Sequence, residues 1–199
     1  MSIAEYLTVQ GRAADLLEAG KRSFLHVGYE KSAVSMIAEH SGISMAHIYN
    51  FYPSKLDLAC AVVGAEIAKL AARLETTVDP NASASARLQD VLLRELTECA
   101  ELLQRYPGLL SCLAIIKKRR PEFYNRVVGV IRPILETVLR SGNMAEEFEV
   151  RDVKQTALLI HSATSRYRYA EELIEAPMDD VRAEYRALTR LLLKGVERR

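Results

Sequence analysis

The sequence predicts an all-α fold, with an amino-terminal three-helix domain over residues 1–56 and a larger helical domain over residues 57–199. Two observations predict this class. Apolar residues recur with a period near 3.6 in almost every segment, and no segment alternates in polarity as a half-buried strand would. Gly, Pro, Ser and Asn interrupt the periodic segments at places that suit connections between helices, which gives about nine helices in all.

The amino-terminal half is expected to begin with a long helix that ends at Gly28, a residue suited to terminating a helix in the left-handed conformation. Two short helices follow. Ser54 then opens another long helix, with Asp57 three residues on as its capping-box partner. The expected helices of this half are 4–27, 33–40, 45–52 and 54–77.

The polar segment DPNASAS, residues 79–85, is the clearest interruption of the periodic pattern. In the helix expected after it, apolar residues nearly encircle the axis, so that helix should be central. Pro133 lies inside a later helix and is expected to kink that helix without ending it. The expected helices of this half are 85–105, 108–119, 121–141, 152–174 and 178–196.

The composition is that of an ordinary soluble globular protein. Of 199 residues, 49% are hydrophobic and 27% are charged, and the net charge of +1 does not by itself indicate a polyanionic partner. The start of the sequence lacks the features of a signal peptide, and the apolar run 109–116 is too short to cross a bilayer. We therefore expect a cytoplasmic protein without a membrane partner.

The three cysteines, Cys60, Cys99 and Cys112, are an odd number without CxxC spacing, and their neighbours are apolar. Buried reduced thiols are one interpretation, and a redox or metal sensor is the other. The four histidines have no carboxylate or cysteine at ligand spacing, so we expect no metal site and no cofactor.

Residues 33–52 carry the most specific pattern in the chain. Gly42 can supply the positive φ of a tight turn between two short helices, and Ser44 is placed to cap the second. Ile43 and Ile48 would bury the inner side of that second helix, while Ala38 is small enough for the helices to cross closely. This is the pattern of a helix-turn-helix.

The outer side of the second helix would carry hydrogen-bond donors, from His47, Tyr49, Asn50 and, just beyond it, Lys55. A helix of this size, about 12 Å long, suits the DNA major groove. The alternative is a purely structural corner between two helices, in which Tyr49 packs as a core aromatic and Lys55 is an ordinary solvated side chain.

The segment "GYEKSAVSMIAEHSGISMAHIYNFYPSKLDL", Gly28 to Leu58, resembles the amino-terminal domain of TetR-family transcriptional repressors. The resemblance covers about a quarter of the chain, residues 10–60. It is carried by Gly28-Tyr29, Ser32, Ile37-Ala38, Gly42-Ile43-Ser44, and Tyr49 with Tyr52 and Lys55. The rest of the chain resembles the family only in its length and helical layout.

The resemblance implies that Tyr49 and Lys55 hold DNA phosphates, and that Ser32 and Ser44 cap the two short helices with their amides facing the DNA backbone. Base reading would fall to the early turns of the second helix. Met45 and His47 stand there, where the family often has Lys or Arg and Thr, so the operator sequence is open.

For the larger domain, the resemblance implies dimerisation through the last two helices, about 152–174 and 178–196, and an inverted-repeat operator. Apolar stripes on those helices would either complete the core or form the dimer seam; they are Val153, Ala157, Ile160, Ala163, Thr164 and Tyr167, and Val181, Tyr185, Leu188, Leu192 and Val196. The resemblance also implies a pocket for a small, mostly apolar effector. Its candidate polar anchors are Cys99, Tyr106, Cys112, Tyr124 and His161, each of which could equally be a core residue.

The sequence therefore favours a ligand-responsive DNA-binding regulator, a repressor that binds its operator as a homodimer and is released by its effector. An enzyme is not expected, because HExxH, GxSxG, P-loop and GxGxxG motifs are all missing from the sequence. The alternative is a helical ligand-binding or protein-interaction module that does not bind DNA.

Overall fold

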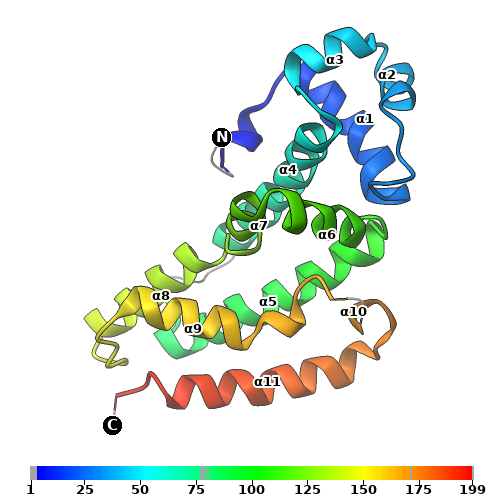
Figure 1. The fold of residues 1–199 in the computed structure, drawn as a ribbon. Helices are drawn as coiled ribbons and strands as arrows, with labels where there is room; N and C mark the ends of the chain where they lie inside the picture. The colour runs from blue at the N-terminus through cyan, green and yellow to red at the C-terminus, as the bar shows by residue number, and fades with distance from the viewer. Residues whose placement is uncertain (1–3, 77–78, 80, 171, 199) are drawn as a thin grey trace. The chain divides into compact units, whose positions relative to one another are not determined.

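The structure, a computed structural model, describes residues 4–76, 79, 81–170 and 172–198, which form helices and short connections (Figure 1). The predicted all-α class is confirmed. An isolated bridge pairs Phe148 with Glu197 near the carboxyl-terminal end.

The chain folds as two compact units. The first unit holds the chain up to Leu70 together with Leu103–Val130, and the second holds Ala71–Leu102 together with the chain from Ile131 onward. Two long helices, α4 (Lys55–Thr76) and α5 (Ala84–Arg105), contribute residues to both units. The predicted functional boundary after residue 56 stays a prediction.

The first unit packs its helices around α1, which buries Leu16, Phe24 and Leu25 completely. The predicted helix 4–27 is interrupted, because Gly11 adopts a positive φ of 62° and separates a short 3-10 turn from α1. Besides parts of α4 and α5, this unit contains η1 (Ala4–Thr8), α1 (Arg12–Val27), α2 (Val34–Ser41), α3 (Met45–Phe51), α6 (Leu109–Arg119) and α7 (Pro121–Val128).

Two glycines join α1 to α6. The Gly108 N–H donates to the Leu25 carbonyl oxygen at 2.7 Å, and a Cβ atom on Gly108 would lie only 2.5 Å from the Gly28 nitrogen. Gly28 ends α1 with φ 99° and ψ 163°, so the predicted positive φ is present but the left-handed helical conformation is not. Neither position leaves room for a side chain without displacing its neighbour.

The second unit surrounds α5. As predicted for a central helix, its apolar residues are buried on several sides, among them Leu88, Val91, Leu92 and Leu96. The unit also contains α8 (Arg132–Met144), α9 (Val153–Ala163), η2 (Ser165–Tyr167), α10 (Glu172–Glu175) and α11 (Met178–Lys194).

Two predicted helices of the second half are broken in the structure. The helix 121–141 does not kink at Pro133 but ends at Val128 and restarts at Arg132, which places Pro133 in the first turn of α8, where no backbone donor is needed. The helix 152–174 ends at Ala163, and Tyr169 beyond it has a positive φ of 46°.

The end predicted at residue 141 lies at Met144, three residues later, and the other described helix ends agree with the prediction within one or two residues. The predicted end of α4 at Thr77, and Pro80 in the polar segment, lie outside the described residues.

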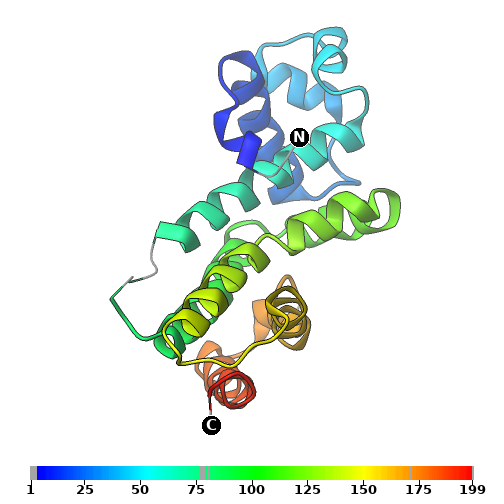
Figure 2. The same ribbon diagram turned by 90° about the vertical axis from the view of Figure 1, so that its left-hand side faces the viewer.

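Figures 1 and 2 show α9 and α11 running side by side, with both seen nearly end-on in Figure 2. Most of the stripe residues predicted on these helices face the core of the second unit: Ala157, Ile160, Thr164, Tyr167, Tyr185 and Val196 are each at most 6% exposed. Ala163 of the predicted stripe is exposed, and the large apolar residues that remain exposed on the two helices are Leu158, Leu159 and Leu191, which lie outside the predicted stripes.

Candidate nucleic-acid interface

The turn between α2 and α3 depends on Gly42, which has φ 66° and ψ 20° in the left-handed region. Its N–H donates to the carbonyl of Glu39, and the Ile43 N–H donates to the carbonyl of Ala38 at 3.2 Å. These bonds satisfy carbonyls that the end of α2 would otherwise leave unpaired. The predicted helix-turn-helix corner is therefore present.

The α3 helix is anchored from one side only. Ile48 is 1% exposed, whereas Met45, Tyr49 and Asn50 are exposed on the rest of its surface. As predicted, Ser44 caps the helix: its hydroxyl oxygen accepts from the His47 N–H at 3.3 Å. The helix is held by its inner edge and keeps its outer side accessible.

The exposed side of α3 has both polar and apolar parts. Tyr49 is 44% exposed, so it is not a core aromatic. His47 is half-buried, and its ring lies 5.2 Å from the ring of Phe51 in an edge-on arrangement. The packing fixes the imidazole while leaving part of it accessible.

Lys55 stands at the first position of α4, next to the end of α3. Its ammonium nitrogen lies 4.5 Å from the centroid of the Tyr29 ring, and that ring stacks on Phe24. Among the described residues no carboxylate forms an ion pair with Lys55, so the aromatic face positions the cation without neutralising it. Ser54 accepts from the Asp57 N–H at 3.1 Å, which confirms the predicted cap of this helix.

Ser32 does not cap α2, and that prediction is wrong. The cap position is Ala33, without a side-chain hydrogen bond, because Ser32 lies one residue too early. The Ser32 hydroxyl is buried and donates to the Gly28 carbonyl at 2.7 Å, so it stabilises the connection after α1. A contact of Ser32 with DNA stays a prediction.

Two exposed apolar residues of this region were not singled out by the sequence analysis. Met36 on α2 is 50% exposed, and Phe51 on α3 is 41% exposed. Helical periodicity could have identified both residues. Met36 and Phe51 lie outside the buried sides of their helices, which Ile37 and Ile48 define.

The five candidate effector anchors are divided between the two units. Cys99 and His161 belong to the second unit, where the His161 carbonyl accepts from Arg168 Nη1 at 2.7 Å and burial raises the pKa of Cys99 far above its usual range. The other three lie in the first unit.

Each anchor of the first unit has a packing role. The Tyr106 ring lies 5.2 Å from the His26 ring, and Cys112, 0% exposed, directs its thiol at the Phe24 carbonyl. Tyr124 is half-buried beneath the Lys117 ammonium. Whether any of the five contacts an effector stays a prediction.

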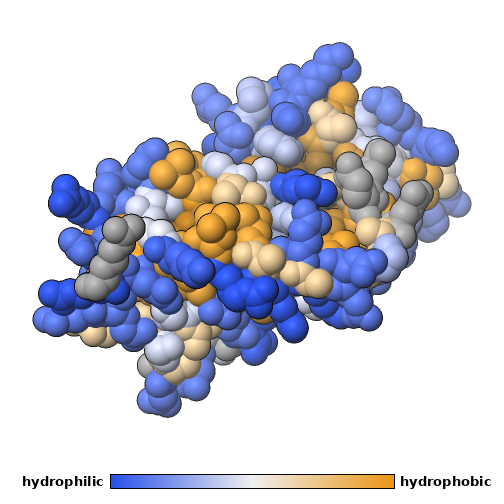
Figure 3. Space-filling view, turned by 90° about the horizontal axis from the view of Figure 1, so that it is seen from below, coloured by the Kyte–Doolittle hydropathy of each residue, from blue (hydrophilic) through white to orange (hydrophobic). Residues whose placement is uncertain are grey.

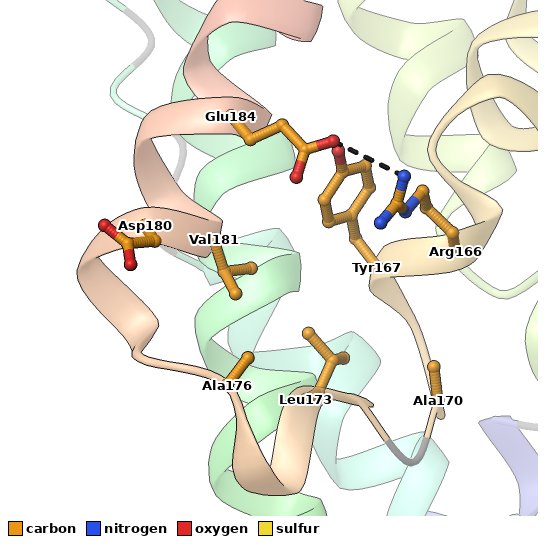
Figure 4. Close-up of a pocket in the computed structure, with 8 residues that line it drawn as sticks. All are labelled: Arg166, Tyr167, Ala170, Leu173, Ala176, Asp180, Val181 and Glu184. Carbon is orange, nitrogen blue, oxygen red and sulfur yellow. Dashed lines mark ion pairs between the residues drawn. The ribbon is translucent and has the colours of Figure 1, made fainter.

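A cavity of about 460 Å³ lies between the end of η2 and the first turns of α11, and Figure 4 shows the residues that line it. The Tyr167 ring forms one wall, and Leu173 and Val181 form the apolar part. Arg166 and Glu184 pair across the rim at 3.4 Å, and Tyr167 hydrogen-bonds the same carboxylate. The charged groups drawn at this rim are therefore largely paired with each other.

Among the described residues, no three His, Cys, Asp or Glu side chains form a group that could hold a metal ion. Every helix in the described ranges is too short or too polar to cross a membrane.

A helix-turn-helix with an accessible second helix, followed by a larger helical unit, defines the class of helical DNA-binding regulators. Comparison with family models sharpens this assignment. Residues 16–62 match the bacterial regulatory proteins of the tetR family, and residues 84–189 match the tetracyclin repressor-like carboxyl-terminal domain. The chain belongs to the TetR family of transcriptional regulators, which are DNA-binding proteins with a ligand-binding domain and not enzymes.

Solved structures of transcriptional regulators share the fold. A TetR-family regulator from Mesorhizobium loti MAFF303099 superposes with a TM-score of 0.75 at 14% identity, covering 94% of this chain and 97% of its own. A regulator from Rhodococcus sp. Rha1 gives 0.71 at 18% identity, covering 94% and 98%. FadR from Bacillus subtilis, in complex with stearoyl-CoA, gives 0.61 at 20% identity, covering 91% and 95%. No curated protein matches the chain.

Proposed function

We propose that this regulator is a repressor that binds an inverted-repeat operator as a homodimer and is released by a small, mostly apolar effector. The observation that carries the proposal is the accessible face of α3, with Tyr49 44% exposed, next to a Lys55 cation that has no carboxylate partner among the described residues.

The residues around α3 divide the work of DNA binding. Tyr49 and Lys55 would hold phosphates, which set the position of the helix without reading sequence. The amide groups at the start of α3, beyond Ser44, would add a favourable dipole for a phosphate. Met45, His47 and Asn50 would meet base edges, Met45 by apolar contact with a thymine methyl group.

The homodimer would form through α9 and α11. Leu158, Leu159 and Leu191 are 38%, 57% and 67% exposed, and Ala183 and Ala187 on α11 are exposed small residues that allow close helix packing. Figure 3 shows apolar residues in contact with solvent among hydrophilic ones on the face that it draws. An inverted-repeat operator would require the homodimer to present two copies of α3 about 34–36 Å apart, one turn of DNA.

The effector would bind in the second unit. A similar fold, that of FadR from Bacillus subtilis, was solved in complex with stearoyl-CoA, which supports a ligand with an apolar chain. An effector that binds better to a conformation unable to bind the operator lowers DNA affinity by its differential binding, about 1–3 kcal/mol in such systems.

DNA binding is tested by selecting bound sites from random duplexes and measuring gel shifts at several salt concentrations. We expect an inverted repeat. Lys55→Gln should weaken operator binding about tenfold. It should also reduce the slope of log K against log salt concentration by about the contribution of one phosphate contact. Lys118→Gln, at an exposed lysine on α6 outside the proposed seam, is the matched control and should change neither quantity. Selection of no site, or equal behaviour of the two variants, would reject this interface.

Dimerisation is tested by sedimentation equilibrium on Leu159→Asp combined with Leu191→Asp. Charges on the proposed seam should convert the dimer to a folded monomer, because each would be buried unpaired in the interface. Met144→Asp is the control, since Met144 is 86% exposed and lies on α8, outside the seam. A double variant that remains dimeric rules out this seam.

A further inference from the structure

A second cavity in the second unit has a volume of about 320 Å³, in the range of small-molecule sites. It lies between the last turn of α4, the first turn of α5 and the first turns of α8. Its wall residues are Glu75, Arg87, Pro133, Ile134, Thr137 and Val138. The helix break before Pro133, which sequence analysis expected to be a kink, brings the start of α8 to this wall.

The guanidinium of Arg87 is the unsatisfied polar group of this cavity. Its Nε atom is buried and has no hydrogen-bond partner among the described residues. A buried donor without a partner costs free energy that native structures rarely leave uncompensated.

The other polar wall residues do not supply that partner. The Thr137 hydroxyl donates to the Pro133 carbonyl at 3.0 Å, within its own helix. Glu75 is exposed, and no ion pair joins it to Arg87 in the described part of the chain.

The cavity of Figure 4 differs in this respect. There the charged wall residue Arg166 already pairs with Glu184, and Tyr167 hydrogen-bonds the same carboxylate. Only the cavity at Arg87 combines apolar walls with a buried cationic donor that lacks a partner, within the residues that the structure describes.

We propose that the cavity at Arg87 binds the effector, and that the effector is an apolar molecule that ends in a carboxylate. A carboxylate can accept two parallel N–H···O bonds from Nε and one terminal nitrogen of a guanidinium. Because Nε is buried in the wall, the Arg87 side chain would turn toward the cavity to form this pair, and the donor would then be satisfied. Ile134, Val138 and the Pro133 ring would contact the apolar part. This inference rests on the proposed effector response of the second unit and names the chemical class of its ligand.

The size of the cavity limits the ligand. At about 30 Å³ for each water-sized group, 320 Å³ holds about ten heavy atoms. Octanoate has ten heavy atoms, so a medium-chain carboxylate matches the volume of the cavity.

The inference is tested by isothermal titration of the full chain, without DNA, with octanoate and with the neutral analogue octan-1-ol. Arg87→Gln should weaken octanoate binding about tenfold or more and leave octan-1-ol binding unchanged. Arg94→Gln is the matched control, because Arg94 lies on the same helix but is exposed and pairs with Asp90 at 2.7 Å. It should bind both compounds as the unaltered chain does.

Thr137→Trp is a second variant that fills the cavity from an exposed wall position, so it should abolish binding of both compounds while the circular dichroism spectrum stays helical. Thr137→Trp also tests the site if the Arg87→Gln variant does not fold. Failure of the unaltered chain to bind octanoate, or equal octanoate binding by Arg87→Gln and Arg94→Gln, overturns the inference. Because these titrations contain no DNA, the gel shifts above separately decide whether the regulator itself binds its operator.

Discussion

Each of the two compact units is stabilised internally by a different kind of polar contact. In the first unit, the segments at the end of α1 and the start of α6 meet through uncharged hydrogen bonds: the Gly108 N–H donates to the Leu25 carbonyl, and the Tyr29 N–H donates to Ser111 Oγ at 3.0 Å. In the second unit, the corresponding contact is a buried ion pair between Arg168 and Glu95. The first arrangement depends on the close approach of Gly28 and Gly108, which have no side chains, and the second depends on a charge that meets its partner.

The ion pair of the second unit is almost completely enclosed. Arg168 donates from Nε to Glu95 Oε1 at 2.5 Å, from Nη2 to Thr164 Oγ1 at 2.5 Å and from Nη1 to the His161 carbonyl at 2.7 Å. Burial raises the pKa of Glu95, although Arg168 opposes the shift. Removing the partner of such a buried charge lowers the free energy of unfolding strongly, because the remaining charge is left unpaired. Disturbing one neutral hydrogen bond costs less.

The largest effect is expected from Glu95→Ala. It leaves the Arg168 guanidinium buried without its carboxylate and should lower the free energy of unfolding by about 3–5 kcal/mol. Urea denaturation followed by circular dichroism measures the change. Glu98→Ala is the control, since Glu98 pairs with Arg73 near the surface and should cost less than about 1 kcal/mol.

A double variant separates the charge from the packing at this site. Glu95→Leu combined with Arg168→Met removes both charges, so it should recover much of the stability that Glu95→Ala loses. If the double variant is as unstable as Glu95→Ala, the comparison between the units is wrong, because packing and not the ion pair would then dominate the second unit.

A smaller effect is expected from Gly108→Ala in the first unit. The new Cβ would meet the Gly28 nitrogen at 2.5 Å and the Phe24 carbonyl oxygen at 2.6 Å, both of them backbone atoms. Such overpacking should cost about 1–3 kcal/mol by the same denaturation. At Gly195 the nearest atom would be at 3.3 Å, so Gly195→Ala should change stability little; a similar loss in both variants would show that contact geometry is not the cause.

The smallest effect is expected from Ser44→Ala, which removes the cap of α3. The expected loss is about 1 kcal/mol, accompanied by weaker operator binding because the first turn of α3 frays. Ser162→Ala provides the comparison, since the Ser162 hydroxyl only donates within α9 to the Leu158 carbonyl. A loss for Ser162→Ala equal to that for Ser44→Ala would contradict the capping argument.

The parts of the fold that the sequence predicts correctly depend on residues close together in the chain. Gly42, Ser44 and Ile48 lie within seven positions, and each acts on the turn or helix that contains it. Their conformational demands are local, so the corner between α2 and α3 could be derived without tertiary contacts.

The predictions that proved wrong concern segments whose structure is decided by residues distant in the chain. The helix expected over 152–174 ends early, and just beyond it Arg168 turns into the core to meet Glu95, 73 positions away. Periodicity identified the apolar stripes of α9 and α11 but could not assign them to the core, because one chain does not reveal which apolar face a neighbouring helix covers. Ser32 was predicted to cap α2, but the cap position is Ala33, one residue later. An error of one residue is within the usual uncertainty of helix ends.

Enclosure lowers the reactivity of the three cysteine thiols toward electrophiles. Burial raises the pKa of Cys60 to about 11 and that of Cys112 to about 12, so at neutral pH no more than about one thiol in ten thousand is the reactive thiolate. Peroxides and alkylating metabolites would therefore attack these sulfurs slowly.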